Sequence, residues 1–260
     1  MSYICLHNKQ EITKLLEKDP YLHIYGLGDL DAFFWSYTTW YGVRSGDELK
    51  AVVLVYAGPH LPTLLGLSKE YDVMAQLLGS VQHLLPCRFY AHLSPGLEEV
   101  FNITHSTESG KEHYKMALLD GGSAAAVDTS EVVRLDLSDL PALQSLYKEN
   151  YPDNWFDPRM LETNQYFGIK DGGRLLSAAG IHVFSPRYKV AALGNITTRT
   201  ELRNKGYGTR VSAALCQSLL ARGMRIGLNV QADNDAAISC YQKIGFQIAA
   251  RYGEFTIERR

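Results

Sequence analysis

The sequence predicts a mixed α+β fold divided into two domains, and three observations support this prediction. Short apolar segments typical of strands alternate with segments whose apolar residues repeat at helical spacing. A glycine-rich turn at residues 203–209 joins a predicted strand to a predicted helix. Small residues at 120–127 separate two patterned halves. With 260 residues and 46% hydrophobic content, the chain is long enough for two cores.

The first half contains predicted helices and strands but no obvious site. Helical spacing covers residues 12–16 and 73–85, while strand-like patterns cover 49–56, 63–67, 88–92 and 114–119. Aromatic residues concentrate between Tyr21 and Tyr41. Such a segment can line a pocket or an interface, but aromatic side chains are more often core, and no site residue is assigned there.

The second half begins with a strand at 132–135 and a helix at 140–147, for which Ser138 or Asp139 is the expected cap. Residues 166–169 and 175–183 predict a hairpin around Asp171-Gly172-Gly173. Between the helix and the hairpin lies the polar and aromatic segment 151–156. From its composition alone, this segment is a proline-containing linker.

The turn at 203–209 has the composition of a phosphate-binding turn. Residues 191–198 predict a buried strand, and Gly206 and Gly208 open a helix that ends near Gly223. The unpaired backbone N–H groups at a helix start favour an anion, and glycine lets phosphate oxygens approach the backbone. Arg203, Lys205 and Arg210 add positive charge. An ordinary tight turn with a solvated basic face is the alternative.

Further elements follow the turn in close succession. Residues 224–230 predict a strand, and Asp233-Asn234-Asp235 is suited to capping a helix that reaches about Ile244. Tyr241 shares one face of that helix with Ala237 and Ile238, and therefore points inward. Gly245-Phe246 then ends the helix and begins another strand.

These residues resemble the signature of the Gcn5-related N-acetyltransferases, the GNAT family. The sequence has Arg203-x-x-Gly206-x-Gly208, then Asn234, Tyr241 and Gly245-Phe246, in the order and spacing of the family. The resemblance covers residues from about 131 to 260 and implies a central, mostly antiparallel sheet splayed at two parallel strands. A Rossmann dinucleotide site fits less well, because no third glycine lies three residues after Gly208.

The resemblance implies how an acyl donor binds. Acetyl-coenzyme A would lie between the two splayed strands, with its pantetheine arm paired to Ile196, Thr197 and Thr198. Its pyrophosphate would rest on the turn, where the implied binding residues are Arg203, Asn204, Lys205, Gly206, Tyr207, Gly208 and Thr209. Asn234 would contact the pantetheine arm, and can cap its helix at the same time. The segment 151–156 would lie in the region where family members often close over the acceptor, and a proline-containing helix linker is an equal alternative. No metal is implied.

Tyr241 is the implied catalytic residue. Acyl transfer from a thioester to an amine expels a thiolate, and a phenol can donate a proton to it. From the helix pattern alone, an inward tyrosine is more often core. Some relatives place a glutamate base five residues before the asparagine, but this chain has Asn229 there. His182, Glu162 and Asp153 are other candidates, each with a structural alternative, and the base stays unassigned.

Composition limits the partners. The net charge is −2, so nothing indicates a nucleic acid partner, and no segment resembles a membrane span or a secretory leader. Cys5, Cys87, Cys216 and Cys240 lack metal-ligand spacing and are expected to be reduced in a cytoplasmic protein. The acceptor is expected to be a small-molecule amine, an amino acid or a peptide. A homodimer is left open.

The domain prediction places an N-terminal domain at 1–120, a linker at 121–130 and a catalytic domain at 131–260. The order of elements in the first half echoes the second, but Ser68-Lys69-Glu70 follows the strand at 63–67 without a glycine turn. The first half is therefore predicted to be a degenerate GNAT-like domain that cannot hold coenzyme A. The layout is similar to that of glycine N-acyltransferase-like proteins, in which such a half would help to shape the acceptor site.

Two functional hypotheses follow. The first is an acyl-coenzyme A-dependent N-acyltransferase, which Tyr241 favours. The second is a non-catalytic acyl-coenzyme A sensor, which the absence of a glutamate at Asn229 keeps open. Use of the turn by another nucleotide is a third alternative.

Overall fold

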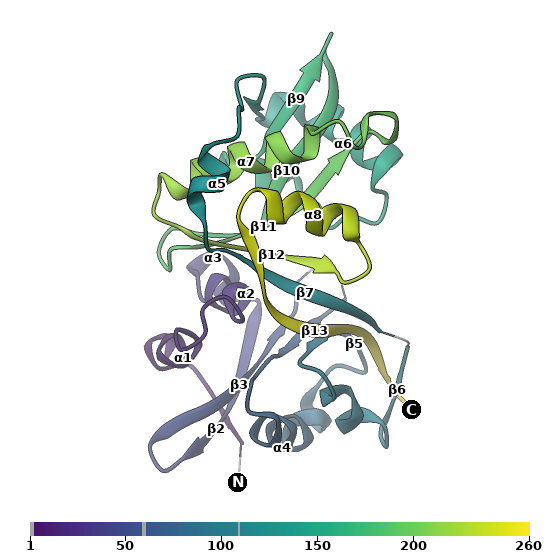
Figure 1. The fold of residues 1–260 in the computed structure, drawn as a ribbon. Helices are drawn as coiled ribbons and strands as arrows, with labels where there is room; N and C mark the ends of the chain where they lie inside the picture. The colour runs from purple at the N-terminus through teal and green to yellow at the C-terminus, as the bar shows by residue number, and fades with distance from the viewer. Residues whose placement is uncertain (1–2, 59–60, 109) are drawn as a thin grey trace. The chain divides into compact units, whose positions relative to one another are not determined.

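The computed structural model describes residues 3–58, 61–108 and 110–260. They form two compact units (Figure 1). The first unit contains residues 1–115, 231–233 and 249–260, and the second contains 116–230 and 234–248. The C-terminal residues 249–260 therefore belong to the same unit as the N-terminal half, whereas the sequence analysis assigned them to the catalytic domain.

The first unit is built on strands that pair in the order β1-β2-β3-β4-β5-β13, with β6 beside β13. β4 and β5 are parallel, and the other pairs in this series are antiparallel. The strands are β1 (Tyr3–Cys5), β2 (Thr38–Ser45), β3 (Glu48–Tyr56), β4 (Thr63–Gly66), β5 (Arg88–Leu93), β6 (His105–Thr107), β7 (Lys111–Leu118) and β13 (Phe246–Arg259). β7 and β13 contribute residues to both units.

The helices of the first unit are α1 (Lys9–Leu16), α2 (Ile24–Asp29), α3 (Ala32–Trp35) and α4 (Tyr71–Val81), with 3-10 turns η1 (Gln82–Leu84) and η2 (Leu97–Phe101). α4 packs on β3 and β2, and its Leu77, Leu78 and Val81 are fully buried. They share a core with Val53, Phe89 and Ile257, so the C-terminal strand completes this core.

The aromatic segment of the first half is only partly core. Trp40 is 2% exposed and stacks on Trp35, with ring centroids 6.3 Å apart. Phe33 and Tyr37 are instead 55% and 45% exposed. The segment also forms strand β2, which the sequence analysis did not assign.

The second unit contains a sheet in the order β12-β11-β10-β9-β8. β11 and β12 are parallel, and the other pairs are antiparallel. Its elements are α5 (Gly121–Ala125), β8 (Val133–Arg134), η3 (Leu137–Asp139), α6 (Leu140–Asn150), η4 (Pro158–Thr163), β9 (Phe167–Asp171), β10 (Arg174–Ser185), β11 (Val190–Thr198), η5 (Thr200–Leu202), α7 (Tyr207–Leu220), β12 (Arg225–Gln231) and α8 (Asp235–Lys243). The predicted hairpin and both helices after residue 200 are present.

Helices cover both faces of the β10 and β11 strands. α7 packs on β9, β10 and β11, and α6 packs on β10 and β11. The consecutive residues Val190, Ala191, Ala192 and Leu193 are all at most 2% exposed. Because successive side chains of a strand point to opposite faces, this run requires cover on both sides.

Two details at the start of the second unit differ from expectation. Residues 121–125, predicted as a linker, form helix α5, and Gln217 on α7 donates to the carbonyl of Ala124 at 2.9 Å. The side chain that caps the start of the next helical segment belongs to Asp136, which accepts from the Ser138 N–H at 2.8 Å. Asp139 is the N-cap residue of α6, as predicted, but its side chain does not cap α6: it accepts from the Asp136 N–H at 3.2 Å, which completes a capping box, and pairs with Lys170.

Candidate active site

The parallel strands β11 and β12 part before they end. Their paired residues run from Val190 and Arg225 to Leu193 and Leu228. β11 nevertheless continues to Thr198 and β12 to Gln231. On its other side, β11 remains paired with β10 through Thr198. The edge of Ile196, Thr197 and Thr198 on the β12 side is therefore not paired with β12, and binding of a donor there stays a prediction.

A β-bulge lies where the two strands separate. The pairing of β10 with β11 jumps from Ala178 and Thr197 to Gly180 and Gly194, and Asn195 inside this jump has φ 53°. A left-handed residue within a strand bends it and redirects the chain that follows. The sequence analysis did not identify this bulge, although Gly194-Asn195 inside a strand is a recognised signal for one.

The turn between β11 and α7 presents a row of unused donors. Asn204 and Gly206 have φ values of 63° and 81°, and Gly206 is the N-cap of α7 without a side-chain cap. In the described part of the chain, no hydrogen bond is donated by the backbone N–H groups of residues 204–209, and the first is donated by Arg210 to Gly206 at 3.1 Å. Such a row at a helix start binds anions.

The three cations of the turn differ in their surroundings. Arg203 folds back, and its Nε and Nη2 donate to the carbonyls of Thr198 at 3.3 Å and Asn150 at 3.4 Å. Arg210 pairs with Glu131 at 2.9 Å and lies over the ring of Tyr207. Lys205 is exposed. Arg203 and Arg210 thus help to hold the turn, while Lys205 contributes charge at its surface.

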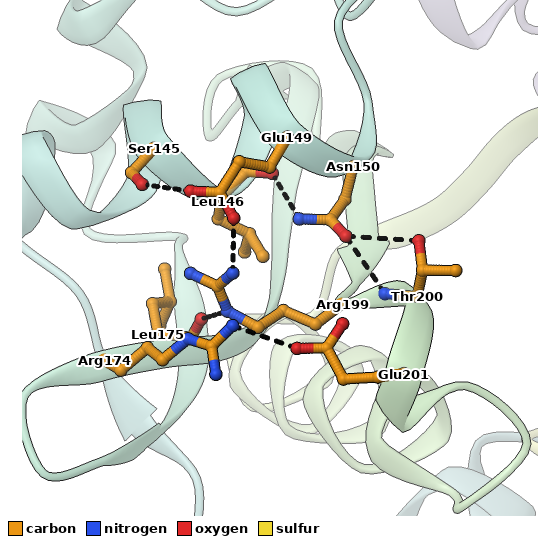
Figure 2. A network of polar contacts seen from close by, with 9 residues as sticks. All are labelled: Ser145, Leu146, Glu149, Asn150, Arg174, Leu175, Arg199, Thr200 and Glu201. Carbon is orange, nitrogen blue, oxygen red and sulfur yellow. Dashed lines mark hydrogen bonds and ion pairs between the residues drawn. The ribbon is translucent and has the colours of Figure 1, made fainter.

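A polar network fastens residues 199–201, just before the turn, to the end of α6 (Figure 2). The guanidinium of Arg199 is 6% exposed, donates from Nε to the Leu175 carbonyl at 2.8 Å and pairs through Nη1 with Glu149 at 2.6 Å. Asn150 accepts from the Thr200 N–H at 3.0 Å. Sequence reasoning missed this network, because its members come from three separate segments.

The second half of α8 lies against the start of α7. Thr209 is 3.3 Å from the Cys240 sulfur, and a β-carbon on Gly208 would be 3.9 Å from the same atom. Asn234 caps α8, with its Oδ1 accepting from the Ala237 N–H at 3.1 Å. The capping role of Asn234 is thereby confirmed, and this bond uses only the oxygen of its side-chain amide.

Tyr241 lies on α8 as predicted and is 9% exposed. Its ring is tilted against that of Phe246, with centroids 6.0 Å apart. Burial raises the pKa of its phenol far above the ordinary value, and Cys240 and Tyr151 add to the effect. The phenol is therefore protonated across the physiological range and can act as a proton donor.

The candidate bases lie in different settings. Glu162 and Asp153 are exposed. His182 lies over Gly194, where an added β-carbon would be 2.4 Å from its ring, and its Nε2 is 3.2 Å from the Asn195 Oδ1. Asn229 stands at the position of the glutamate of some relatives, and its amide cannot accept a proton at neutral pH.

The segment 151–156 is anchored against the bulge. Trp155 accepts through its carbonyl from Asn195 Nδ2 at 3.1 Å, and its ring meets His182 edge-on with centroids 5.9 Å apart. Phe156 lies between the rings of Tyr147 and Tyr166, at 5.2 and 5.7 Å. An aromatic wall thus stands beside the place where β11 bends.

The parallel pair of the first unit contrasts with that of the second. β4 and β5 stay paired up to Gly66 and Leu93, and the Ser94 N–H donates to the Gly66 carbonyl at 3.1 Å. The chain then passes to α4 through Ser68, whose N–H bonds to the Ser94 hydroxyl at 2.9 Å. Among the described residues, β4 and β5 therefore stay paired to their ends, whereas β11 and β12 part before theirs.

Within the described residues 3–58, 61–108 and 110–260, no group of three or more His, Cys, Asp or Glu residues is arranged to hold a metal ion. No helix in the same ranges is long and apolar enough to cross a membrane.

Comparison with known proteins gives the site a family context. The model of the acetyltransferase (GNAT) family matches residues 132–246. N-alpha-acetyltransferase RimI of Mycobacterium tuberculosis is 34% identical over 88 residues, which are 32% of this chain and 52% of that protein. The match spans about half the length of this relative.

Solved structures share the fold over nearly the whole chain. A Drosophila protein has a TM-score of 0.73 at 15% identity, with 98% of each chain covered. A GNAT-family acetyltransferase from Colwellia psychrerythraea has a TM-score of 0.59 at 14% identity, covering 99% of this chain and all (100%) of its own. A tandem GNAT protein from the clavulanic acid biosynthesis pathway has a TM-score of 0.60 at 15% identity, covering 99% and 98%.

These findings confirm the predicted fold class, a mixed α+β GNAT fold with a mostly antiparallel sheet and parallel strands at the site. Residues 132–246 form a domain that matches the acetyltransferase (GNAT) family.

Proposed function

We propose that this protein is an acyl-coenzyme A-dependent N-acyltransferase that transfers an acetyl group from acetyl-coenzyme A to a primary amine. One observation carries the proposal: the open edge of β11 leads directly into a turn whose backbone N–H groups from Asn204 to Thr209 donate no hydrogen bond in the described chain. A long ligand with an extended amide-containing arm and a pyrophosphate matches both features.

The residues fit this donor along its length. The pantetheine amides would pair with the backbone of Ile196, Thr197 and Thr198, and the pyrophosphate would accept from the turn, with Lys205 adding charge. Asn234 would donate its amide N–H to the pantetheine arm. The donor would then carry its thioester to the region between the β11 bulge and Tyr241.

The reaction is a direct transfer. The neutral amine attacks the thioester carbonyl, a C–N bond forms and the C–S bond breaks, leaving coenzyme A as a thiolate. Tyr241 would give this thiolate a hydrogen bond or a proton, and the raised pKa, which keeps the phenol protonated but makes it a weaker acid, favours the hydrogen bond. The ammonium proton of the product passes to a base that is not assigned among the residues of this chain.

The acceptor class is part of the proposal. The curated relative is an N-alpha-acetyltransferase by name, which supports an α-amine, such as a free amino acid or a peptide terminus. The four cysteines are free in the structure, which suits a cytoplasmic enzyme. The acyl-coenzyme A sensor remains the second candidate, because Asn229 replaces the glutamate that serves as base in some relatives.

Thermal unfolding with acetyl-coenzyme A, S-acetylpantetheine, NAD and ATP tests donor binding. A ligand of the folded state raises the melting temperature, so acetyl-coenzyme A should stabilise most, and S-acetylpantetheine, which lacks the pyrophosphate, much less. Lys205→Glu should lower the affinity for acetyl-coenzyme A by about three- to tenfold, since the turn loses its exposed cation. Lys14→Glu, an exposed lysine of the first unit, makes the same charge change and should leave affinity unaltered.

Release of free thiol during a screen of amines, amino acids and short peptides then separates the enzyme from the sensor. Stabilisation by acetyl-coenzyme A without thiol release on any acceptor would support the sensor. Stabilisation by NAD or ATP in place of acetyl-coenzyme A would overturn both.

A further inference from the structure

The entry of the turn at residues 203–209 is held by the last residue of α6. The Oδ1 of Asn150 accepts from the Thr200 N–H at 3.0 Å and from the Thr200 hydroxyl at 3.3 Å. The backbone carbonyl of Asn150 accepts from Nη2 of Arg203 at 3.4 Å. These three bonds form the Asn150 clamp. The clamp connects one residue of α6 to the first residue of η5 and to the residue that follows η5.

Asn150 is itself fixed in place. Its Nδ2 donates to the carbonyl of the fully buried Leu146 at 3.0 Å, which determines the orientation of the amide and leaves Oδ1 facing Thr200 (Figure 2). The preceding residue, Glu149, pairs with the buried guanidinium of Arg199 at 2.6 Å. The clamp is therefore mounted on a helix end that has its own bonds to the core and to the chain before the turn.

Arg203 connects the clamp to the strand before the turn. The Asn150 carbonyl is one of the last four of α6, which have no partner within the helix, and a cation is favoured at this end of a helix. The same guanidinium donates from Nε to the carbonyl of Thr198, the last residue of β11, at 3.3 Å. Asn150 thus fixes the turn relative to the edge of β11.

The turn has little else to hold its entry. Residues 203–206 are exposed, so packing contributes little there, and Glu201 adds only an exposed ion pair with Arg174. The exit is held by α7, where the Arg210 N–H donates to the Gly206 carbonyl at 3.1 Å. A row of N–H groups binds an anion well only when the groups are held in one arrangement before the anion arrives. The shape of the row at 204–209 therefore depends on the clamp.

We infer that Asn150 is a positioning residue for the donor, because the Asn150 clamp sets the entry of the turn so that the N–H groups of residues 204–209 act together on the pyrophosphate. The inference rests on the proposed function for the identity of the ligand, and it requires donor binding but not acyl transfer. Asn150 acts through Thr200 and Arg203 rather than by touching the donor. Its loss should impair recognition of the pyrophosphate and spare the pairing of the pantetheine arm with β11.

Asn150→Ala removes the acceptor of both Thr200 bonds and keeps the backbone carbonyl that Arg203 uses. The affinity for acetyl-coenzyme A should fall by about five- to tenfold, as expected when one or two neutral hydrogen bonds that hold a binding element are lost. The affinity for S-acetylpantetheine, which lacks the pyrophosphate, should fall by less than about twofold. Isothermal titration calorimetry measures both, and an equal loss for the two ligands would contradict a role at the pyrophosphate.

Asn8→Ala is the matched control for a general loss of stability. The Oδ1 of Asn8 also accepts from backbone N–H groups, those of Gln10 and Glu11 at the start of α1 in the first unit. Its removal should lower the free energy of unfolding through the lost cap and leave both affinities unaltered. The same loss of acetyl-coenzyme A affinity in Asn8→Ala would overturn the assignment of the effect to the clamp.

Thr200→Val tests whether Asn150 acts through Thr200. This variant deletes only the hydroxyl bond of an exposed side chain and should lower the affinity for acetyl-coenzyme A by about twofold. In the Asn150→Ala background it should cause no further loss, because the acceptor is already absent. Additive losses would refute action through Thr200. If Asn150→Ala does not fold, Thr200→Val decides alone, and an unaltered affinity overturns the inference.

Hydrogen exchange of the free protein tests the clamp without a ligand. The N–H groups of Thr200, Leu202 and Arg203 are bonded, whereas those of residues 204–209 donate no hydrogen bond in the described chain. Asn150→Ala should therefore speed exchange in a peptide covering 200–203 by about tenfold or more, and Asn8→Ala should leave it unchanged. Unaltered exchange together with unaltered affinity would refute the inference and leave the proposed function intact.

The wild-type protein separates the inference from the proposed function. If it binds no acetyl-coenzyme A, the proposed function and the donor role of Asn150 fall together, and the exchange rates still decide whether Asn150 holds the turn. If it binds acetyl-coenzyme A but releases no thiol, the sensor replaces the enzyme and the donor role stands. In an active enzyme, Asn150→Ala should raise the KM for acetyl-coenzyme A and change kcat by less than about twofold, and a fall in kcat alone would contradict donor positioning.

Discussion

At the scale of single residues, the family signature predicted where the site residues lie in the fold, but not which side chains they contact. Asn234 caps α8 and Tyr241 is buried on the same helix, as the spacing required. The sequence did not predict that Arg203 bonds back to its own turn or that Asn195 in the bulge bonds to Trp155. Both features depend on partners distant in sequence, such as Asn150 and Trp155, and local spacing contains no information about them.

Tyr241→Phe should lower kcat by about a hundredfold and leave the affinity for acetyl-coenzyme A almost unchanged, because only the proton donor is lost. Since burial raises the pKa of this phenol, ionisation of Tyr241 should cause no loss of activity up to about pH 10, the ordinary pKa of a tyrosine. Steady-state kinetics across pH measure both effects.

Tyr188→Phe makes the same chemical change in the turn between β10 and β11 and should leave kcat unchanged. Full kcat in Tyr241→Phe would remove Tyr241 from the mechanism.

At the scale of elements, the sequence predicted most of what lies near the site. Strands at 190–198 and 225–231, and helices at 207–220 and 235–243, agree with the apolar periodicity and the glycine stops. Among the strands, the misses are β1, β2, β6 and the length of β13, and the short helices α2, α3 and α5 were not predicted either. In β2, alternation is obscured by aromatic residues on both faces, and β1 and β6 are too short to show a period.

The network of Figure 2 offers a comparison between two arginines on neighbouring segments. Arg199→Met removes a buried guanidinium that bonds to the Leu175 carbonyl and to Glu149, and should lower the free energy of unfolding by about 2 kcal/mol. Arg174→Met breaks only the pair with Glu201, in which both side chains are more than half exposed, and should cost less than about 0.5 kcal/mol.

Urea denaturation measures both arginine variants. Equal losses of stability would mean that the buried network contributes no more than a surface ion pair. The affinity for acetyl-coenzyme A should also fall in Arg199→Met, because Thr200 and the turn after it lose an anchor.

At the scale of the whole molecule, the sequence predicted two units but not which segments form them. Residues 249–260 read as the last strand of the second half, yet they pair with β5 and bury Ile257 in the core of the first unit. A strand pattern specifies which faces are buried but not which neighbour it pairs with, so this assignment needs the structure.

A buried lysine makes stability depend on pH. Lys115 is 1% exposed and lies 4.6 Å from the ring centroid of Tyr252, and burial lowers its pKa to about 8 while Glu254 opposes the shift. Between pH 8 and the ordinary pKa of 10.5, the unfolded chain holds a proton that the folded chain has released. The free energy of unfolding contributed by this group therefore rises with pH across that window, by roughly 3 kcal/mol at most.

Lys115→Met should abolish this rise, whereas Lys111→Met, an exposed lysine on the same strand, should preserve it. Urea denaturation at several values between pH 7 and pH 10.5 measures the difference between the two variants. If the free energy of unfolding rises with pH equally in both variants, Lys115 is not the group that causes the rise.

The C-terminal strand also bears on how the chain is made. A domain usually folds as its residues leave the ribosome, N-terminal part first. Here the first unit lacks a core strand until residues 249–259 have been synthesised, long after Lys115 has emerged, while residues 116–230 and 234–248 of the second unit are already complete. The first unit is thus expected to reach its native structure after the second unit. Until then, the edge of β5 that later pairs with β13 is unpaired and must be shielded from other chains.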